Sequence, residues 1–349
     1  MELPPLHMSA AKRPLGSIAS GKVDHVVIIF KENHTFDNYF GTFPGVNGMT
    51  MPRSPNPPPR DPDHRHSAWL SRQTTSVRQQ FVEADIPAYF AYARKFTLCD
   101  QYFTDVAGPS TPNHLMVLAA DSPFIDNPHP GDPSRIASSL PLGIESHKLS
   151  WGNYGGYAFQ YLSGVGGRNK FTSDQFAKDA AAGKLPNVSW VYATSQFDEH
   201  PPDPGKGPMG NVTTGMQWTV DQVNAIVEGG LWGKSAIFIT WDDWGGWYDH
   251  VNPPSVETWK LATPQPSYKG TQFRYGSRVP CLVLGLYAKS GYISRNLHSH
   301  VSLVKFCESL FGLPSLNQRD SQADDMSDCF DFTKTQAHHY RNLEAILEL

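Results

Sequence analysis

The sequence predicts an α/β protein with a largely parallel β-sheet sandwiched by helices. Two observations support this fold class. Short runs of aliphatic and β-branched residues end in polar residues, and amphipathic segments of helical length lie between those runs. Strands that alternate with helices are typical of a parallel sheet covered on both faces. Ligands bind beyond the carboxyl ends of such strands, which is where this sequence concentrates acidic residues.

The predicted strands are short and apolar. Residues 23–30 (VDHVVIIF) precede the polar cluster KENH, so we expect a buried parallel strand that delivers polar side chains at its C-terminal end. Residues 235–243 (SAIFITWDD) repeat this pattern, and residues 281–288 repeat it without the acidic end. Residues 189–193 are a weaker fourth candidate.

Three helices are predicted between the strands. Residues 76–95 have mixed apolar spacing, and Pro87 is expected to break that helix in two. Residues 220–231 place valine and isoleucine three, six and seven positions apart, on one helical face. Residues 301–311 form another helix, which Gly312 and a proline two positions later should end.

The chain of 349 residues shows no shift in composition that would mark a domain boundary. We therefore expect an N-terminal extension over residues 1–22, a single domain with one site over residues 23–333, and a C-terminal tail or helix over residues 334–349. The proline-rich residues 52–62 should form an insertion over the sheet edge.

Composition excludes several classes of function. The formal net charge of −4 argues against broad electrostatic capture of nucleic acid or of an anionic membrane. No apolar run approaches the roughly 18 residues needed to span a bilayer, so membrane contact should be peripheral at most. The N-terminus (MELPPLHMSAAKRPLGS) has no hydrophobic segment of signal-peptide length, so we expect no export signal in this chain.

The four cysteines are Cys99, Cys281, Cys307 and Cys329. They are too few for a disulfide scaffold, and no two of them have the CxxC spacing of metal-thiolate or redox motifs. We expect buried thiols, or at most one or two disulfide bridges.

Asp242 and Asp243 follow an apolar strand and precede the segment WGGW. Two adjacent carboxylates repel each other unless a positive group holds them, and a hard divalent cation is a common solution. Glu32 and Asn33 end the first predicted strand and could complete the oxygen ligands. The alternative for both pairs is a capping or turn-ordering role, which has equal weight for the aspartates and more weight for Glu32 and Asn33 alone.

A hydroxyl nucleophile is the second candidate feature. Ser110 and Thr111 lie in the segment GPSTPNH, directly before an apolar run. Such a hydroxyl can cap a helix or act as a nucleophile, and capping is the commoner role. The chain has no GxSxG elbow, which disfavours an α/β-hydrolase esterase. A metal-coordinated hydroxyl needs no such elbow.

Histidines lie in two proline-bounded acidic loops, as His64 in DPDHRH and His200 in DEHPP. A histidine beside carboxylates is more readily held as imidazolium, which suits binding of a phosphoryl oxygen or protonation of a leaving group. Taken singly, each is better explained as a solvated loop residue. His66 could instead pair with His64 on a transition metal.

Tryptophans surround the aspartate pair. Trp244 and Trp247 could line a substrate pocket, for example an aromatic cage for a choline head group. Packing in the core and loops is the more common role for such residues.

These segments together resemble the phosphoesterase family of bacterial and plant non-specific phospholipases C and acid phosphatases, a branch of the alkaline phosphatase superfamily. Seven motifs in order carry the resemblance over nearly the whole chain: VIIFKENHTFDNYFGTFPGV, DPDH, ARKFTLCDQYFTDVAGPSTPNHL, DEHPP, LWGKSAIFITWDDWGGWYDHV, HSHVSLVKFCESLFGL and CFDF.

The resemblance implies an alkaline-phosphatase-like fold with loop insertions over the active site, and one divalent metal ion. The implied metal ligands are Glu32, Asn33, Ser110, Asp242 and Asp243. Ser110 would be the nucleophile, and His64 and His200 would contact the phosphoryl or leaving group. Secondary candidates are Thr111, His114, His250 and His300.

Three departures from the family pattern matter. Asp243 stands where the family usually has Glu, and Ser299 stands where many members have Asp. The chain is also shorter than many phospholipase C relatives and shows no evident C-terminal lipid-engaging domain. This last feature weakens the phospholipid assignment and leaves the phosphoesterase assignment untouched.

We therefore expect a metal-dependent phosphoric ester hydrolase with a covalent phosphoseryl intermediate, acting on a small phosphate ester or a phospholipid head group as an acid phosphatase or a phospholipase C-type enzyme. Oxygen ligands favour Ca²⁺, Mg²⁺ or Mn²⁺, and nearby histidines admit Zn²⁺ or Fe. One alternative is a catalytically silent, Trp-rich module that binds a lipid or carbohydrate head group. Another is a sulfatase or phosphonate hydrolase, although His114 stands where a sulfatase motif has Arg. Relatives are often secreted or periplasmic, so the location stays open.

Overall fold

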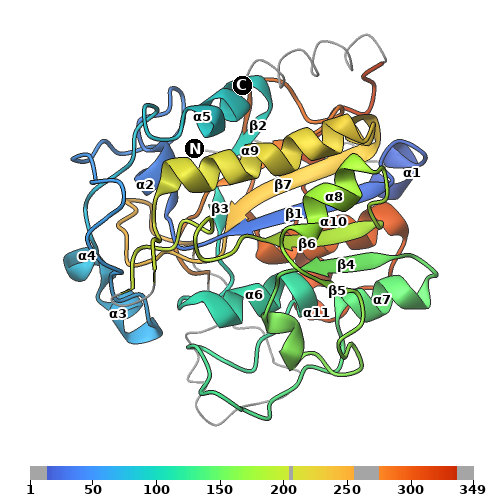
Figure 1. The fold of residues 1–349 in the computed structure, drawn as a ribbon, viewed down its shortest axis with the longest axis horizontal. Coiled ribbons are helices and arrows are strands. Elements are labelled where there is room, and N and C mark those ends of the chain that lie inside the picture. Colours follow the sequence, from blue (N-terminus) through green and yellow to red (C-terminus); the bar gives the residue numbers. More distant parts are fainter. Residues whose placement is uncertain (1–13, 204–206, 255–274, 336–349) are drawn as a thin grey trace, which may run out of the picture.

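The computed structural model describes residues 14–203, 207–254 and 275–335, which are arranged around one large β-sheet (Figure 1). The strand order in this sheet is β5-β4-β6-β1-β7-β8-β2-β9. Its strands are β1 (His25–Lys31), β2 (Thr97–Cys99), β4 (Trp151–Tyr154), β5 (Lys170–Phe171), β6 (Val188–Tyr192), β7 (Ser235–Trp241), β8 (Cys281–Leu284) and β9 (Tyr292–Ser294). A separate parallel pair joins β3 (Tyr102–Phe103) to β10 (His298–Ser299).

Strand β1 lies at the centre of the sheet, parallel to both β6 and β7. All of its residues after His25 are buried, because the strand has neighbours on both edges and helices over both faces. This burial explains its continuous apolar sequence and confirms the first predicted strand. The strand predicted over residues 281–288 ends at Leu284 and runs antiparallel to β7 and β2, so the sheet is largely but not wholly parallel. A strand buried on both faces is apolar throughout whether it pairs parallel or antiparallel, so its composition does not indicate its direction.

Helices cover both faces of the sheet, which confirms the predicted fold class. Figure 1 shows α8 and α9 on the near face and α10 behind the sheet, where α10 packs against α1, α6 and α11. The helices are α1 (Leu15–Ala19), α2 (Phe36–Phe40), α3 (His66–Leu70), α4 (Arg72–Thr75), α5 (Pro87–Lys95), α6 (Ser110–Ala119), α7 (Leu140–Ser146), α8 (Gln175–Ala181), α9 (Val212–Glu228), α10 (His300–Phe311) and α11 (Gln318–Gln322). Short 3₁₀ helices are η1 (Ala158–Tyr161), η2 (Trp232–Lys234) and η3 (Ser327–Cys329).

The helix predicted over residues 76–95 is correct only in its second half. Helix α5 begins at Pro87, whose fixed φ and missing N–H suit the first turn. Residues 76–86 are not helical: Val77 and Gln80 form bridges to other loops, and residues 83–86 form a turn. The helix predicted over residues 220–231 is the second half of α9, which starts earlier because Asn211 caps it. Helix α10 matches its prediction.

The proline-rich segment lies over the carboxyl ends of the central strands. The backbone N–H of Asp61 donates to the carbonyl of Pro202, at 3.0 Å, in the loop that follows β6. This contact holds the segment carrying His64 beside the segment carrying His200.

Part of the predicted N-terminal extension packs into the core. Helix α1 contacts α10, and its residues Leu15 and Ala19 are buried. A Cβ on Gly16 would lie 2.6 Å from the carbonyl oxygen of Ser309, which shows how closely the two helices approach. The C-terminal residues 336–349 lie outside the described residues. Among the described helices, none has the length and apolar character needed to cross a membrane.

Replacing Leu15 should destabilise the whole domain. Leu15→Ala removes a buried side chain between α1 and α10, and we expect the free energy of unfolding to fall by about 2–5 kcal/mol. Denaturant unfolding of the full chain measures this change. Ser17→Ala on the exposed face of α1 should alter it by less than about 0.5 kcal/mol. Equal effects from the two substitutions would contradict a core role for α1.

Candidate active site

The central strands bring two acidic segments together. Because β1 and β7 are parallel and pair Lys31 with Trp241, the residues that follow them leave the sheet side by side. The backbone N–H of Asn33 donates to Asp242 Oδ1 at 3.0 Å, and the N–H of Asp242 donates to the carbonyl of Lys31 at 3.0 Å. The predicted ligand pairs therefore do meet at the carboxyl edge of the sheet.

Ser110 begins α6 and points into this acidic cluster. Its Oγ lies 3.2 Å from Glu32 Oε2, 3.4 Å from Asn33 Oδ1 and 3.1 Å from Asp243 Oδ2. The residue at the cap position is Pro109, which makes no cap hydrogen bond, and the N–H of Thr111 in the first turn donates to Asn127 Oδ1 at 2.8 Å. The hydroxyl of Ser110 thus faces carboxylates. A capping hydroxyl would instead accept a hydrogen bond from a backbone N–H of the helix.

Burial sets the charge states of the aspartate pair. Burial and the neighbouring carboxylate of Asp242 raise the pKa of Asp243 well above its ordinary value. Burial opposes ionisation of Asp242 as well, but hydrogen bonding and charge from His114 hold the pKa of Asp242 at about 2. Without a further positive charge, only one of the two aspartates, Asp242, is readily ionised.

The donor set fits a hard divalent cation. One terminal atom of the Asn33 amide lies 2.9 Å from both Asp242 Oδ1 and Glu32 Oε2, while the other lies 3.0 Å from His200 Nε2. Asp242 Oδ2 is buried and lies 3.2 Å from His114 Nε2. A cation among the carboxylate, amide and hydroxyl oxygens would satisfy these atoms together. Glu32, His114 and Asp242 also have ligand atoms within 4.8 Å of one another.

His114 belongs to the site, although the sequence ranked it as a secondary candidate. Its Nε2 lies 3.3 Å from Glu32 Oε1 and 3.2 Å from Asp242 Oδ2. Burial disfavours its charged form, yet the two carboxylates raise the pKa of His114 to about 9. The ring stacks on Tyr192 and meets Phe30 edge-on, which fixes its orientation. His114 adds a nitrogen donor to the oxygen-rich cluster.

His64 and His200 lie next to each other beside Asn33. Their ring centroids are 5.9 Å apart, and His64 Nε2 is 3.3 Å from Asn33 Nδ2. Burial works against the imidazolium form, but Asp243 and Asp61 raise the pKa of His64 to about 10. Burial likewise opposes the charge on His200, and Glu32 and Asp61 still raise its pKa. Asp61, which the sequence did not single out, thus acts on both rings.

A buried carboxylate supports the loop that carries His200. Glu199 has a left-handed backbone (φ 77°) and lies 3.3 Å from Lys31 Nζ. The side-chain donors to its carboxylate are Tyr39 and Tyr89 at 2.7 Å and Trp241 at 2.9 Å. A carboxylate with this many donors holds an otherwise strained loop in place. Its position between Asp198 and His200 in DEHPP was the only sequence signal.

Three other candidates contact the site indirectly or lie apart from it. His300 Nε2 donates to the carbonyl of Asp242 at 2.8 Å and so supports the end of β7. Thr111 Oγ1 bonds to Tyr157 at 2.9 Å. His66 Nδ1 lies 2.6 Å from the carbonyl of Ala107, and His66 joins no metal-binding group of the described residues.

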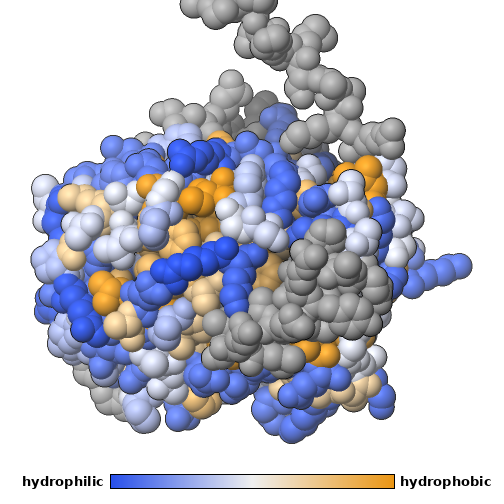
Figure 2. All heavy atoms as spheres, turned by 90° about the horizontal axis from the view of Figure 1, so that it is seen from above, coloured by the Kyte–Doolittle hydropathy of each residue, from blue (hydrophilic) through white to orange (hydrophobic). Residues whose placement is uncertain are grey.

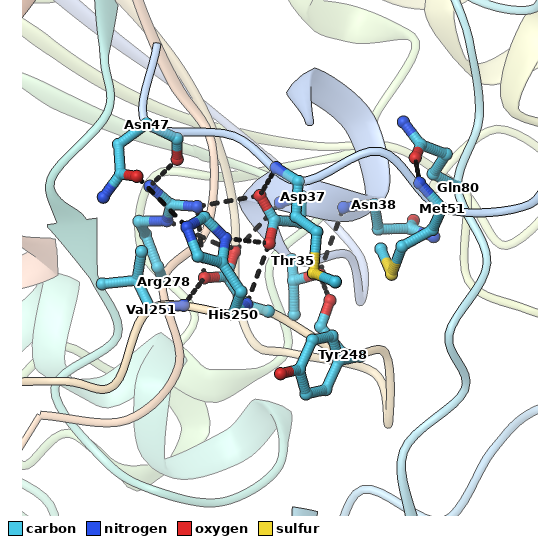
Figure 3. A network of polar contacts seen from close by, with 12 residues as sticks. Thr35, Asp37, Asn38, Asn47, Met51, Gln80, Tyr248, His250, Val251 and Arg278 are labelled. Atoms are coloured by element: carbon cyan, nitrogen blue, oxygen red, sulfur yellow. Dashed lines mark hydrogen bonds and ion pairs between the residues drawn. The ribbon is translucent and has the colours of Figure 1, made fainter. Parts of the chain in front are cut away.

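His250 lies in a separate polar network, shown in Figure 3. Its Nδ1 lies 2.5 Å from Asp37 Oδ2, and its Nε2 lies 3.1 Å from Asn47 Oδ1. The buried guanidinium of Arg278 forms ion pairs with Asp37 at 3.0 Å and with Asp249 at 3.2 Å. This network ties α2 to the segment after β7, so the contacts of His250 are structural.

Both tryptophans assigned to a substrate pocket are buried. Trp244 is 1% exposed and donates from Nε1 to the carbonyl of His64 at 2.8 Å. Trp247 is 2% exposed and stacks on His34. These rings therefore pack under the site and present no open face to a ligand. The exposed aromatic ring beside the cluster is Tyr157, 5.1 Å from the ring of His114.

Comparison with known proteins identifies the family. The Phosphoesterase family model matches residues 23–61 and 60–314. The chain belongs to the Phosphoesterase family. The resemblance is thereby confirmed.

Relatives in this family are larger than the chain. The non-hemolytic phospholipase C of Pseudomonas aeruginosa is 26% identical over 89% of this chain, which spans 57% of that protein. Phospholipase C B of Mycobacterium tuberculosis is 25% identical over 89% of this chain and 78% of its own length. Among solved structures, the lipoteichoic acid synthase LtaP of Listeria monocytogenes has a TM-score of 0.50 at 11% identity, covering 89% of this chain and 78% of its own. This last likeness shows the fold alone.

The close approach of two loops at Gly245 should be essential for the site. A Cβ at Gly245 would lie 2.2 Å from the carbonyl oxygen of Asn33, and the residue has φ 56°. We expect Gly245→Ala to displace Asn33 and weaken Mn²⁺ binding at least tenfold, measured by equilibrium dialysis. Gly230→Ala is a matched control, because Gly230 has φ 72° and nothing within 4 Å of the added Cβ. Similar Mn²⁺ affinities for both variants would contradict this role.

Proposed function

We propose that the chain is a metal-dependent phosphoric ester hydrolase in which Ser110 is the nucleophile. The observation that carries the proposal is the placement of the Ser110 hydroxyl within 3.4 Å of Glu32, Asn33 and Asp243. Membership of the Phosphoesterase family supports it. A silent binding module would not need a hydroxyl held among buried carboxylates.

The residues that would hold the metal ion are Glu32, Asn33, Asp242 and Asp243, together with the hydroxyl of Ser110. A bound divalent ion would favour the alkoxide form of that hydroxyl and offset the negative charge of the cluster. The oxygen donors favour Ca²⁺, Mg²⁺ or Mn²⁺, and His114 would also admit Zn²⁺.

The protein residues divide the reaction between them. Ser110 Oγ attacks phosphorus, its proton passes to the carboxylate of Asp243 at 3.1 Å, and a phosphoserine forms as the bond to the leaving oxygen breaks. His64 and His200 face the same space; they donate to phosphoryl oxygens and supply the proton to the departing alkoxide. Water then attacks the phosphoserine, which releases phosphate or a phosphate monoester and restores Ser110.

The substrate class follows from the relatives and from one aromatic residue. The relatives named phospholipase C support cleavage of a phospholipid-type diester. Tyr157 supports a cationic head group such as choline, because it is 43% exposed beside His114 and can contact a cation through its ring face. Hydrophobic residues form small groups between hydrophilic ones on the face in Figure 2, which fits brief, peripheral lipid contact. Phosphomonoesters, the substrates of an acid phosphatase, are the second candidate, since they would use the same nucleophile.

Removing the hydroxyl of Ser110 should abolish turnover. Release of nitrophenol from nitrophenyl phosphate and nitrophenyl phosphorylcholine should fall at least about 1,000-fold in Ser110→Ala, and chelator should stop both reactions in the parent protein. The preferred ester will separate the phosphatase from the phospholipase C-type activity. Thr111→Ala is the matched control and should keep most of the activity. A Ser110→Ala rate near that of the parent would refute the nucleophile assignment.

Losing a buried carboxylate should empty the metal site. We expect Asp242→Asn to reduce Mn²⁺ binding at least tenfold, because the site loses one negative charge and the pairing partner of His114. Asp63→Asn in the exposed part of the His64 loop is the control and should bind like the parent. Equilibrium dialysis measures both variants. Full Mn²⁺ occupancy in Asp242→Asn would rule out its role as a ligand.

A further inference from the structure

Three distant segments bring two thiols and an imidazole together away from the acidic cluster. Cys99 ends β2, His298 begins β10, and Cys329 ends η3. All three side chains are buried, and their ligand atoms lie within 4.8 Å of one another. The reaction proposed above uses none of these residues.

The distances match the edges of a tetrahedral zinc site. With Zn–S near about 2.3 Å and Zn–N near about 2.0 Å, two sulfurs should lie about 3.8 Å apart, and a sulfur and a nitrogen about 3.6 Å apart. Cys99 Sγ lies 3.7 Å from Cys329 Sγ, and Cys329 Sγ lies 3.9 Å from His298 Nε2. Two of the three edges are therefore close to those of a zinc site, and the third, between Cys99 and His298, lies within 4.8 Å.

Asp328 offers a further donor beside Cys329 and His298. Its Oδ1 lies 3.7 Å from Cys329 Sγ and 3.3 Å from His298 Nε2, against about 3.5 Å and about 3.4 Å for a tetrahedron. Its other oxygen, Oδ2, accepts from Ser294 Oγ at 2.5 Å, which fixes the carboxylate. Ser294 Oγ also lies 2.9 Å from His298 Nε2 and can keep its hydrogen directed at Asp328.

The outer surroundings of His298 are those of a metal-bound histidine. Its second nitrogen, Nδ1, lies 3.0 Å from Asp324 Oδ1. A carboxylate on the far nitrogen of a ligating histidine orients the ring and increases its basicity. The plain alternative is an imidazolium ion held between Asp324 and Asp328, with two neutral thiols beside it. That alternative accounts for the histidine, and a hydrogen bond between the two thiols accounts for the 3.7 Å between their sulfurs. Cobalt binding distinguishes the two arrangements.

We propose that Cys99, His298, Cys329 and Asp328 bind one structural Zn²⁺ ion, independently of the acidic site. Burial raises the pKa values of both thiols well above the ordinary value, so metal binding would release two protons from Cys99 and Cys329. Soft thiolate ligands select Zn²⁺ over the ions that prefer oxygen.

The ion would link η3 to strand β2 of the sheet and to the start of α10. The carbonyl of Cys329 already accepts from Thr97 Oγ1 at 3.1 Å and from the N–H of Lys289 at 2.9 Å. His298 lies two residues before His300, which supports Asp242. Zinc binding would therefore stabilise the frame on which the acidic site rests.

Cobalt substitution tests this proposal with a signal that only thiolates give. The full chain, reduced and treated with chelator, is titrated with Co²⁺ under argon while near-ultraviolet thiolate-to-cobalt charge transfer is recorded. We expect a band that saturates at one Co²⁺ per chain and disappears when Zn²⁺ displaces the cobalt. Oxygen and nitrogen ligands at the acidic site give no such band, so Asp242→Asn should retain it.

Variants identify the ligands. Cys99→Ser and Cys329→Ser should lose the band, whereas Cys307→Ser, a buried thiol elsewhere on α10, should keep it. If the ligand variants do not fold, Asp324→Asn keeps all four ligands and should weaken Co²⁺ binding about 10–100-fold. The proposal is overturned by a folded, reduced parent without the band, by a Cys329→Ser variant that retains it, by unchanged affinity in Asp324→Asn, or by a Cys99–Cys329 disulfide in protein isolated without reductant.

Discussion

The structure depends on burying several carboxylates at one point. Asp242 and Asp243 are fully buried next to Glu32, and like charges in a low-dielectric interior repel strongly. The histidines around them offset part of this charge, and the divalent ion that we propose would offset the rest. The histidines and backbone N–H groups at the carboxyl edge of the sheet hold these carboxylates together.

Backbone geometry enforces the arrangement before any ion binds. The pairing of β1 with β7 fixes where both acidic segments begin, and Asn33 turns out of its strand with a left-handed backbone (φ 66°). Gly245 allows the loop after β7 to touch the carbonyl of Asn33, because a larger residue would collide there. The site is thus preorganised, which lowers the cost of collecting like charges when the cation arrives.

The sequence predicted this edge of the sheet well, because local patterns carry the necessary information. An apolar strand followed by acidic residues indicates both the strand and the position of its polar end, as seen for β1 and β7. The sequence did not indicate that β8 runs antiparallel, because burial on both faces removes any directional signal. The first half of the helix predicted over residues 76–95 was wrong. Bridges to distant loops, and not the spacing of apolar residues, determine the conformation before Pro87.

Side-chain roles were harder to predict wherever the supporting partner is remote in sequence. His250 carries a family-like motif, yet Asp37 and Arg278, which lie far from it in the chain, place it in a separate network. Trp244 and Trp247 flank the aspartates in sequence, but the tight turn at Gly245 and Gly246 folds both indoles inward. In the same way, the absence of CxxC spacing disfavoured a thiolate site, although three unrelated segments bring thiols and an imidazole together.

Donor chemistry explains how the two proposed ion sites can coexist in one chain. The acidic site offers mainly carboxylate, amide and hydroxyl oxygens, which suit hard cations such as Ca²⁺, Mg²⁺ or Mn²⁺. The site at Cys99 and Cys329 offers two sulfurs and one imidazole, which suit Zn²⁺ and bind hard cations poorly. The sulfur site therefore excludes the hard cations, whereas the acidic site would accept Zn²⁺ as well with the help of His114. Because thiolates bind Zn²⁺ more strongly, the sulfur site would fill first and leave the acidic site to the harder ion.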